Sequence, residues 1–145
     1  MPDWRLTTAR APHPVHAILL AFPIALFTSA VVTDIAYLRT AELQWSNFSQ
    51  WLISGGLLFG GLVLLWALVS LALGWRGADR IRRLVYAGVL AAMWILGLVN
   101  IFKHSQDGWS SVQTFGLVLS ILCALLALAA GVLAFSNLGE REVAR

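Results

Sequence analysis

The sequence HPVHAILLAFPIALFTSAVVTDI, residues 13–35, decides the fold, because it is a membrane-length apolar run with ionisable side chains at both ends. A helix needs about 20 apolar residues to cross a bilayer core. At 1.5 Å rise per residue, His16 and Asp34 lie roughly 27 Å apart along such a helix. Steps of three and four residues keep both on one face. The stripe that joins them consists of His16, Leu20, Pro23, Phe27, Ala30 and Asp34.

The composition places the whole chain in a membrane. Of its 145 residues, 59% are hydrophobic and 12% are charged, whereas a soluble domain has about 25% charged residues. Four spans of about 20 residues or more use most of this length and leave no room for a soluble domain. The single Cys123 excludes disulfide frameworks and cysteine-rich metal or haem-attachment motifs. The sequence therefore predicts an all-α integral membrane bundle of four transmembrane helices.

The apolar runs also set the expected boundaries. Residues 1–12 are polar and are predicted to form an N-terminal arm, and residues 136–145 a charged tail. The bundle between them, residues 13–135, is predicted to have a loop at 38–50 whose aromatic residues are typical of a membrane interface. The four spans are expected at about residues 15–37, 51–73, 84–102 and 112–135.

The basic residues predict an orientation. With four spans both termini share one side, and eight basic residues fall there against two on the other. Because basic residues favour the cytoplasmic side, we expect a multi-pass protein of the bacterial inner membrane with both termini cytoplasmic. The charge thus reflects topology and the lipid bilayer, with no nucleic-acid partner. The first side holds Arg5, Arg10, Arg76, Arg80, Arg82, Arg83, Arg141 and Arg145, and the second Arg39 and Lys103.

Small residues in the second span predict close helix contact. The sequence SGGLLFGG, residues 54–61, contains Gly56 and Gly60 in a Gly-x-x-x-Gly pair, which lets a second backbone approach. Packing within the protomer is favoured over a dimer face at this motif. The expected partners besides lipid are another copy of the chain or a redox partner subunit.

The ionisable residues are the candidates for chemistry. His13 and His16 flank Pro14 at one mouth of the first helix and are the candidate cofactor ligands, because a neutral imidazole can bind haem iron or a metal or can relay protons. Asp34, Asn100 and His104 are expected at the opposite edge as a proton or partner site. The alternative for these groups is interfacial capping.

Two geometric expectations accompany these candidates. If Asp34 is an interfacial cap, Lys103 or Arg39 is its expected ion-pair partner. A haem b held by two histidines needs both at one depth, and His104 is a membrane thickness away from His16. A second ligand would therefore come from another protomer, a partner subunit or a residue other than His, and the identity of any metal stays open.

The His-Pro-x-His opening, the Phe-Pro-Ile-Ala-Leu core and the closing Asp of residues 13–35 resemble the bacterial membrane family called domain of unknown function 2231. The span pattern is compatible with that family over about residues 13–135. The resemblance implies a four-span protein, and relatives that carry Rieske-type or cytochrome c domains, or lie beside quinoprotein dehydrogenase genes, imply electron transfer with haem b or quinone. The matching positions are His13, His16, Pro23 and Asp34.

The chain departs from the family pattern near its third span. Many members have a further His there, whereas residues 80–90 read RIRRLVYAGVL, with Tyr86 and no His. We therefore expect a small membrane subunit that passes electrons between a periplasmic partner and haem b or quinone, rather than a stand-alone enzyme. The alternative is a non-catalytic structural or assembly protein. A proton-coupled transporter is less favoured, because the chain lacks an internal repeat and mid-membrane charges.

Overall fold

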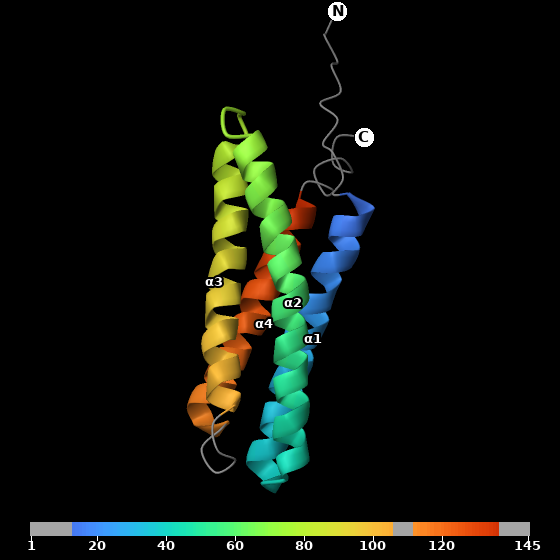
Figure 1. The fold of residues 1–145 in the computed structure, drawn as a ribbon, viewed down its shortest axis with the longest axis vertical. Coiled ribbons are helices and arrows are strands. Elements are labelled where there is room, and N and C mark those ends of the chain that lie inside the picture. The colour runs from blue at the N-terminus through green and yellow to red at the C-terminus, as the bar shows by residue number, and fades with distance from the viewer. Residues whose placement is uncertain (1–12, 106–111, 137–145) are drawn as a thin grey trace, which may run out of the picture.

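The structure, a computed structural model, describes residues 13–105 and 112–136. It consists of α1 (Pro14–Thr40), α2 (Leu43–Leu73), α3 (Arg80–His104) and α4 (Gln113–Phe135) (Figure 1). Each helix is long and apolar enough to cross a membrane. Over the described residues the chain has no strand, which confirms the predicted all-α bundle of four membrane helices.

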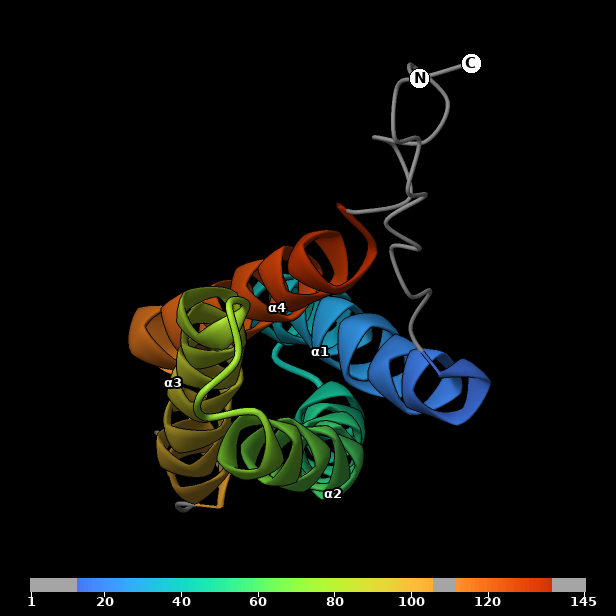
Figure 2. The same cartoon turned by 90° about the horizontal axis from the view of Figure 1, so that it is seen from above.

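The four helices run alternately up and down and form a ring. Seen from above in Figure 2, each helix packs against two neighbours, and α1 closes the ring by contacting α4. One end holds the start of α1, the connection 74–79 and the end of α4, and we call it the His16 end. The other end holds the end of α1, the starts of α2 and α4 and the end of α3, and we call it the Asp34 end.

Helix α1 buries the stripe that its sequence predicts. Pro14 occupies its first turn, where a missing N–H is tolerated, and the His13 side chain caps it by accepting a hydrogen bond from the Val15 N–H at 3.3 Å. The stripe turns toward the other helices and leaves the remaining apolar faces of α1 outward. Its buried residues are His16, Leu20, Pro23, Phe27, Ala30, Thr33 and Asp34.

The predicted loop 38–50 is wrong for most of its length. Only Ala41 and Glu42 lie outside helices there, and α2 begins at Leu43, eight residues before the expected start of the span. Ala41 adopts a left-handed conformation (φ 56°), which turns the chain sharply enough for a two-residue connection between antiparallel helices. The aromatic residues of this segment therefore extend α2. Helix α3 likewise begins at Arg80, four residues before its expected start.

Gly56 and Gly60 lie on the buried face of α2. A Cβ atom at Gly56 would lie 3.0 Å from Cζ of Phe27 on α1, and one at Gly60 would lie 2.9 Å from Cε of Met93 on α3. Both distances are too short for comfortable packing, so the missing side chains make room for neighbours in the same chain. The two glycines thus set the spacing of α2 from α1 and α3.

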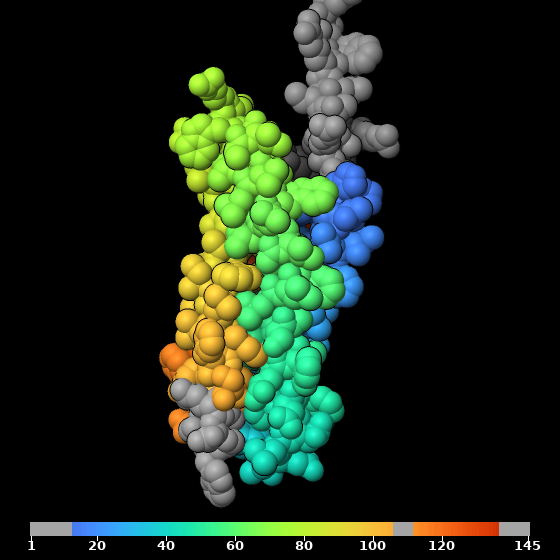
Figure 3. Space-filling view, viewed as in Figure 1, coloured from blue at the N-terminus to red at the C-terminus, as the bar shows by residue number. Residues whose placement is uncertain are grey.

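Most of the apolar surface faces outward. In the most apolar stretch of each helix, 28% of the residues of α1, α2 and α3 and 39% of those of α4 are buried. Figure 3 shows α2 and α3 side by side along one such face. Because large apolar side chains are exposed on every helix, the surroundings that fit this molecule are the hydrocarbon chains of lipid.

Candidate functional sites

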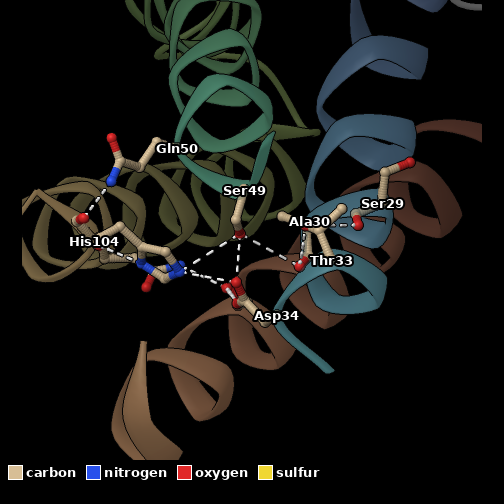
Figure 4. Close-up of polar contacts among 9 residues, drawn as sticks. Ser29, Ala30, Thr33, Asp34, Ser49, Gln50 and His104 are labelled. Atoms are coloured by element: carbon tan, nitrogen blue, oxygen red, sulfur yellow. Dashed lines mark hydrogen bonds and ion pairs between the residues drawn. The ribbon is translucent and has the colours of Figure 1, made fainter. Parts of the chain in front are cut away.

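At the Asp34 end, a buried carboxylate is contacted by all three of the other helices. Figure 4 shows two of these contacts, with Ser49 of α2 and His104 of α3. Asp34 has no exposed surface. Its Oδ1 accepts a hydrogen bond from the Ser49 hydroxyl of α2 and lies 2.9 Å from His104 Nε2 of α3. Its Oδ2 accepts a hydrogen bond from Ser120 Oγ of α4 at 2.5 Å. The carboxylate is therefore the point at which the four helices are tied together.

A second layer of hydrogen bonds orients these partners. Asn100 Nδ2 donates to Ser120 Oγ at 2.8 Å, and the Asn100 backbone carbonyl lies 3.0 Å from His104 Nδ1. Gln50 Nε2 donates to the backbone carbonyl of His104 at 2.5 Å. Among the described residues, Asn100 Oδ1 is a buried acceptor without a hydrogen-bond partner. We call Asp34, Ser49, Asn100, His104 and Ser120 the four-helix polar cluster.

The structure corrects the expected ion-pair partner of Asp34. The sequence predicted Lys103 or Arg39, whereas the contact is with His104. Successive residues on a helix are about 100° apart, so the neighbouring Lys103 and His104 cannot both face the bundle. His104 is fully buried, while the Lys103 ammonium lies 5.8 Å from the Phe115 ring centroid.

The structure brings Asp34, Asn100 and His104 together, and it adds two serines that sequence reasoning missed. Ser49 lies in the predicted loop 38–50, where helical periodicity does not apply, whereas in the structure it is on the buried face of α2 and donates to Asp34. Ser120 stands alone in a run of Leu, Val and Ile, residues 115–122 of sequence FGLVLSIL. A lone hydroxyl in such a run was the available signal, because a polar group inside a membrane needs a partner.

At the His16 end, a second group of side chains brings together α1, α2 and α3. His16 is 7% exposed, and its Nε2 lies 3.0 Å from the hydroxyl of Tyr86 on α3. The ring of Trp66 on α2 lies with its centroid 5.6 Å from that of His13 and 5.7 Å from that of His16. The sequence singled out both histidines, and it pointed to Tyr86 only as the place where an expected His is absent.

Trp66 also borders an apolar groove on the outer surface. The groove has a volume of about 470 Å³, and Trp66 is the lining residue whose ring contacts the two histidines. Helix α1 contributes one residue to it and α2 the others. Its lining consists of Leu19, Leu62, Leu65, Trp66, Val69 and Ser70.

The positions of the histidines and carboxylates show whether they could bind a metal ion or a haem together. Within the described ranges, no group of three or more His, Cys, Asp or Glu side chains is placed to hold a metal ion. His16 and His104 lie at opposite ends of the bundle. The side chain that faces His16 is Tyr86, in direct hydrogen-bonding contact, so no haem plane fits between these two atoms.

The fold and its two buried polar groups define a small multi-pass membrane protein with a helical bundle and no soluble domain in the described part. The chain belongs to the family described as "Predicted membrane protein (DUF2231)", whose sequence model matches residues 12–137. No curated protein and no solved structure matches the chain. The family resemblance expected from residues 13–35 is confirmed, and the family description names no activity.

Proposed function

We propose that this protein is the quinone-binding membrane subunit of a redox system, with the quinone head group beside His16. Trp66 is the observation that carries the proposal. Its ring lines the apolar groove and also lies against both His13 and His16. An apolar groove that ends at a few polar side chains is the usual form of a small-molecule site.

The chemistry of these residues suits a quinone. A quinone has an apolar tail, which matches the groove, and two carbonyl oxygens that accept hydrogen bonds. Imidazole and phenol groups can both donate such bonds. The Tyr86 hydroxyl and His16 Nε2 are 3.0 Å apart, so a proton can pass between them. When one of the two donates a proton to the quinone, the other can replace that proton. The quinone supplies the electron chemistry, and the chain supplies orientation and protons.

The same geometry favours quinone over haem b. A six-coordinate haem needs an axial ligand on each face of the ring. The hydrogen bond between His16 and Tyr86 leaves no space for the haem ring between these side chains. His104 contacts Asp34, which lies roughly 27 Å from His16 along α1, so His104 cannot supply the second ligand. Haem would therefore require the two helices α1 and α3 to separate.

The distance between the two ends also determines where an electron-transfer partner would have to dock in this proposal. Electron tunnelling slows steeply with distance, so a donor docked at the Asp34 end would be too remote from a quinone beside His16. The redox partner in this proposal contacts the His16 end. A periplasmic partner is then compatible only with an orientation opposite to the one that the basic residues predict, which makes topology a test of the partner's side.

The proposal is tested by binding of a short-chain ubiquinone analogue to the purified protein in lipid nanodiscs. Binding is measured by quenching of the fluorescence of the seven tryptophans, which include Trp66, and by isothermal titration calorimetry. His16→Ala and Tyr86→Phe should each weaken binding about tenfold, equivalent to about 1.4 kcal/mol. Asp34→Asn, at the other end, is the matched control and should bind normally. A wild-type protein without quinone affinity would refute the proposal, and so would a loss confined to Asp34→Asn. A haem spectrum of the purified, reduced protein would favour haem b instead.

A structural or assembly role is the second candidate, and a specific observation favours it. Asp34 has hydrogen-bonding contacts with three other helices, as expected for a residue that specifies the bundle. On this reading, His16→Ala and Tyr86→Phe leave any associated redox activity unchanged, while Asp34→Ala reduces the amount of folded protein. The binding experiment above distinguishes the two candidates.

A further inference from the structure

The four-helix polar cluster fixes the position of one proton on His104. Nδ1 of His104 lies 3.0 Å from the backbone carbonyl oxygen of Asn100. A carbonyl oxygen only accepts hydrogen bonds, so the contact requires a hydrogen on Nδ1. This contact within α3 is independent of the state of Asp34, and it leaves Nε2 as the ring nitrogen that faces the carboxylate.

The contact between Nε2 and Asp34 then requires a second proton. The two atoms are 2.9 Å apart, which is hydrogen-bonding distance. If His104 were neutral and Asp34 ionised, two acceptors would face each other without a hydrogen between them. We propose that Asp34 and His104 form a proton-binding site that holds one proton between Nε2 and Oδ1. The proton resides on the imidazole, as an ion pair, or on the carboxyl group, as a neutral pair, and in both cases the pair has no net charge.

Burial strengthens this inference, because both side chains are fully enclosed. Releasing the proton would leave a single negative charge inside the bundle, where an uncompensated charge is costly. The surrounding hydroxyls cannot replace the proton, since Ser49 and Ser120 already donate to the two carboxylate oxygens. The bound proton is therefore part of the structure of the Asp34 end.

Among residues 13–105 and 112–136, the side chains that hydrogen-bond to the pair or to its partners carry no charge of their own. Helix α2 contributes Ser49 and Gln50, α3 contributes Asn100, and α4 contributes Ser120. Lys103, adjacent to His104 in sequence, has its ammonium over the Phe115 ring at 5.8 Å. The buried Oδ1 of Asn100 is an acceptor that a water or hydroxyl donor could use, next to Ser120.

This proton site lies at the opposite end from the proposed quinone site and does not depend on it. Its ligand is a proton, and the expected stoichiometry is one proton per chain. Release of this proton would leave a negative charge at the point where the four helices meet, and so would couple their packing at the Asp34 end to proton availability.

The test uses the full-length wild-type protein in lipid bilayers. Nitrogen-15 NMR of labelled histidine reports the hydrogens on each ring nitrogen, and infrared spectra with carbon-13 aspartate report whether Asp34 is a carboxylate or a carboxylic acid. Between about pH 5 and 8, the range in which free His changes charge, we expect either an imidazolium with a carboxylate or a neutral imidazole with a carboxylic acid. A neutral His104 beside an ionised Asp34 at neutral pH would overturn the proposal.

Assignment of the signals needs matched variants. The histidine whose NMR signal does not change between about pH 5 and 8 is expected to be His104, so His104→Gln should remove that signal. Asp34→Asn should remove the infrared band of the carboxyl group that pairs with it. If either variant fails to fold, His13→Gln and His16→Gln identify His104 by elimination, because the chain has three histidines. A histidine signal that stays constant but is lost in His16→Gln would assign the proton to the His16 end and would also overturn the proposal.

Discussion

At the scale of single residues, we expect substitutions of Asp34 to lower the stability of the bundle the most. Its carboxylate accepts hydrogen bonds from Ser49 and Ser120 and contacts His104. Removing one member of a buried ionic pair leaves the other member uncompensated and costs about 3–5 kcal/mol. Both oxygens of the Asp34 carboxylate have hydrogen-bond partners in the wild type. A substitution that removes them leaves Ser49, His104 and Ser120 without that partner.

We predict that Asp34→Ala lowers the free energy of unfolding by about 3–5 kcal/mol, measured by denaturation in mixed micelles. Asp34→Asn keeps the shape and one acceptor, and its amide can donate to Nε2 of His104, so its loss should be smaller. Ser120→Ala removes one donor and should cost about 1–3 kcal/mol. Equal stability of Asp34→Ala and the wild type would show that the cluster does not hold the helices together.

The sequence anticipated part of this cluster and missed part of it. Steps of three and four residues were enough to place Asp34 on the buried face of α1, and Asn100 with His104 on that of α3. Which helices meet is a property of tertiary packing, so periodicity did not pair Asp34 with His104. Ser49 could not be predicted for a different reason, because the predicted loop covers residues 38–50 whereas only residues 41 and 42 separate the two helices.

At the scale of helices, two glycines of α2 lie where the packing between helices is tight. The positions of Gly56 and Gly60 leave no space for a larger side chain before Phe27 or Met93 is reached. Gly88 on α3 differs, because a Cβ atom there would have no neighbour within 4 Å. The chain thus contains its own control for the effect of removing a helical glycine.

We predict that Gly56→Leu and Gly60→Leu each destabilise the bundle by about 1–3 kcal/mol, because overpacking forces neighbouring side chains to shift. Gly88→Ala should be neutral or stabilising by up to about 1 kcal/mol, since alanine favours a helix over glycine. Thermal unfolding in detergent and the oligomeric state measure both effects. Unchanged stability in both leucine variants would show that α2 does not need this close approach.

The connection between α1 and α2 gives a second prediction at this scale. Ala41 is left-handed (φ 56°), a conformation that costs a residue with a Cβ about 1–2 kcal/mol relative to its usual region. Ala41→Gly should therefore stabilise the protein, by up to about 1 kcal/mol. Ala36→Gly, within α1, is the control and should destabilise by about the same amount. A destabilising Ala41→Gly would mean that the turn is held by something other than its backbone conformation.

The boundaries of the helices show the limit of sequence reasoning at this scale. Apolar length located four spans, because the bilayer imposes that length. Aromatic and polar residues at 43–50 signal an interface, but an interface can be occupied by a helix as readily as by a loop. In the structure the left-handed conformation of Ala41 allows a two-residue connection, so residues 43–50 form a helix and not a loop. Neither composition nor residue spacing predicts a left-handed alanine.

At the scale of the whole molecule, the bundle has two different ends. The His16 end has an exposed His13, a groove open to the hydrocarbon and a hydrogen-bonded His16 and Tyr86. The Asp34 end is closed around a neutral, proton-holding pair. Such an asymmetry gives the orientation of the chain in the membrane a direct functional meaning, because it decides which compartment each end meets.

Orientation is measured by labelling single cysteines from outside the cell, and the structure chooses where to put them. A reporter inserted in residues 38–50 would split a helix at nearly every position, so we use Glu42→Cys and Arg76→Cys, both exposed, in a Cys123→Ala background. From the basic residues we expect a membrane-impermeant maleimide to label Glu42→Cys in intact spheroplasts, and Arg76→Cys only after permeabilisation. The opposite pattern would turn the His16 end toward the periplasm. It would bring the proposed quinone head group within reach of a periplasmic electron donor and would move the proton-binding pair to the cytoplasmic side, so this labelling result selects the compartment of the redox partner.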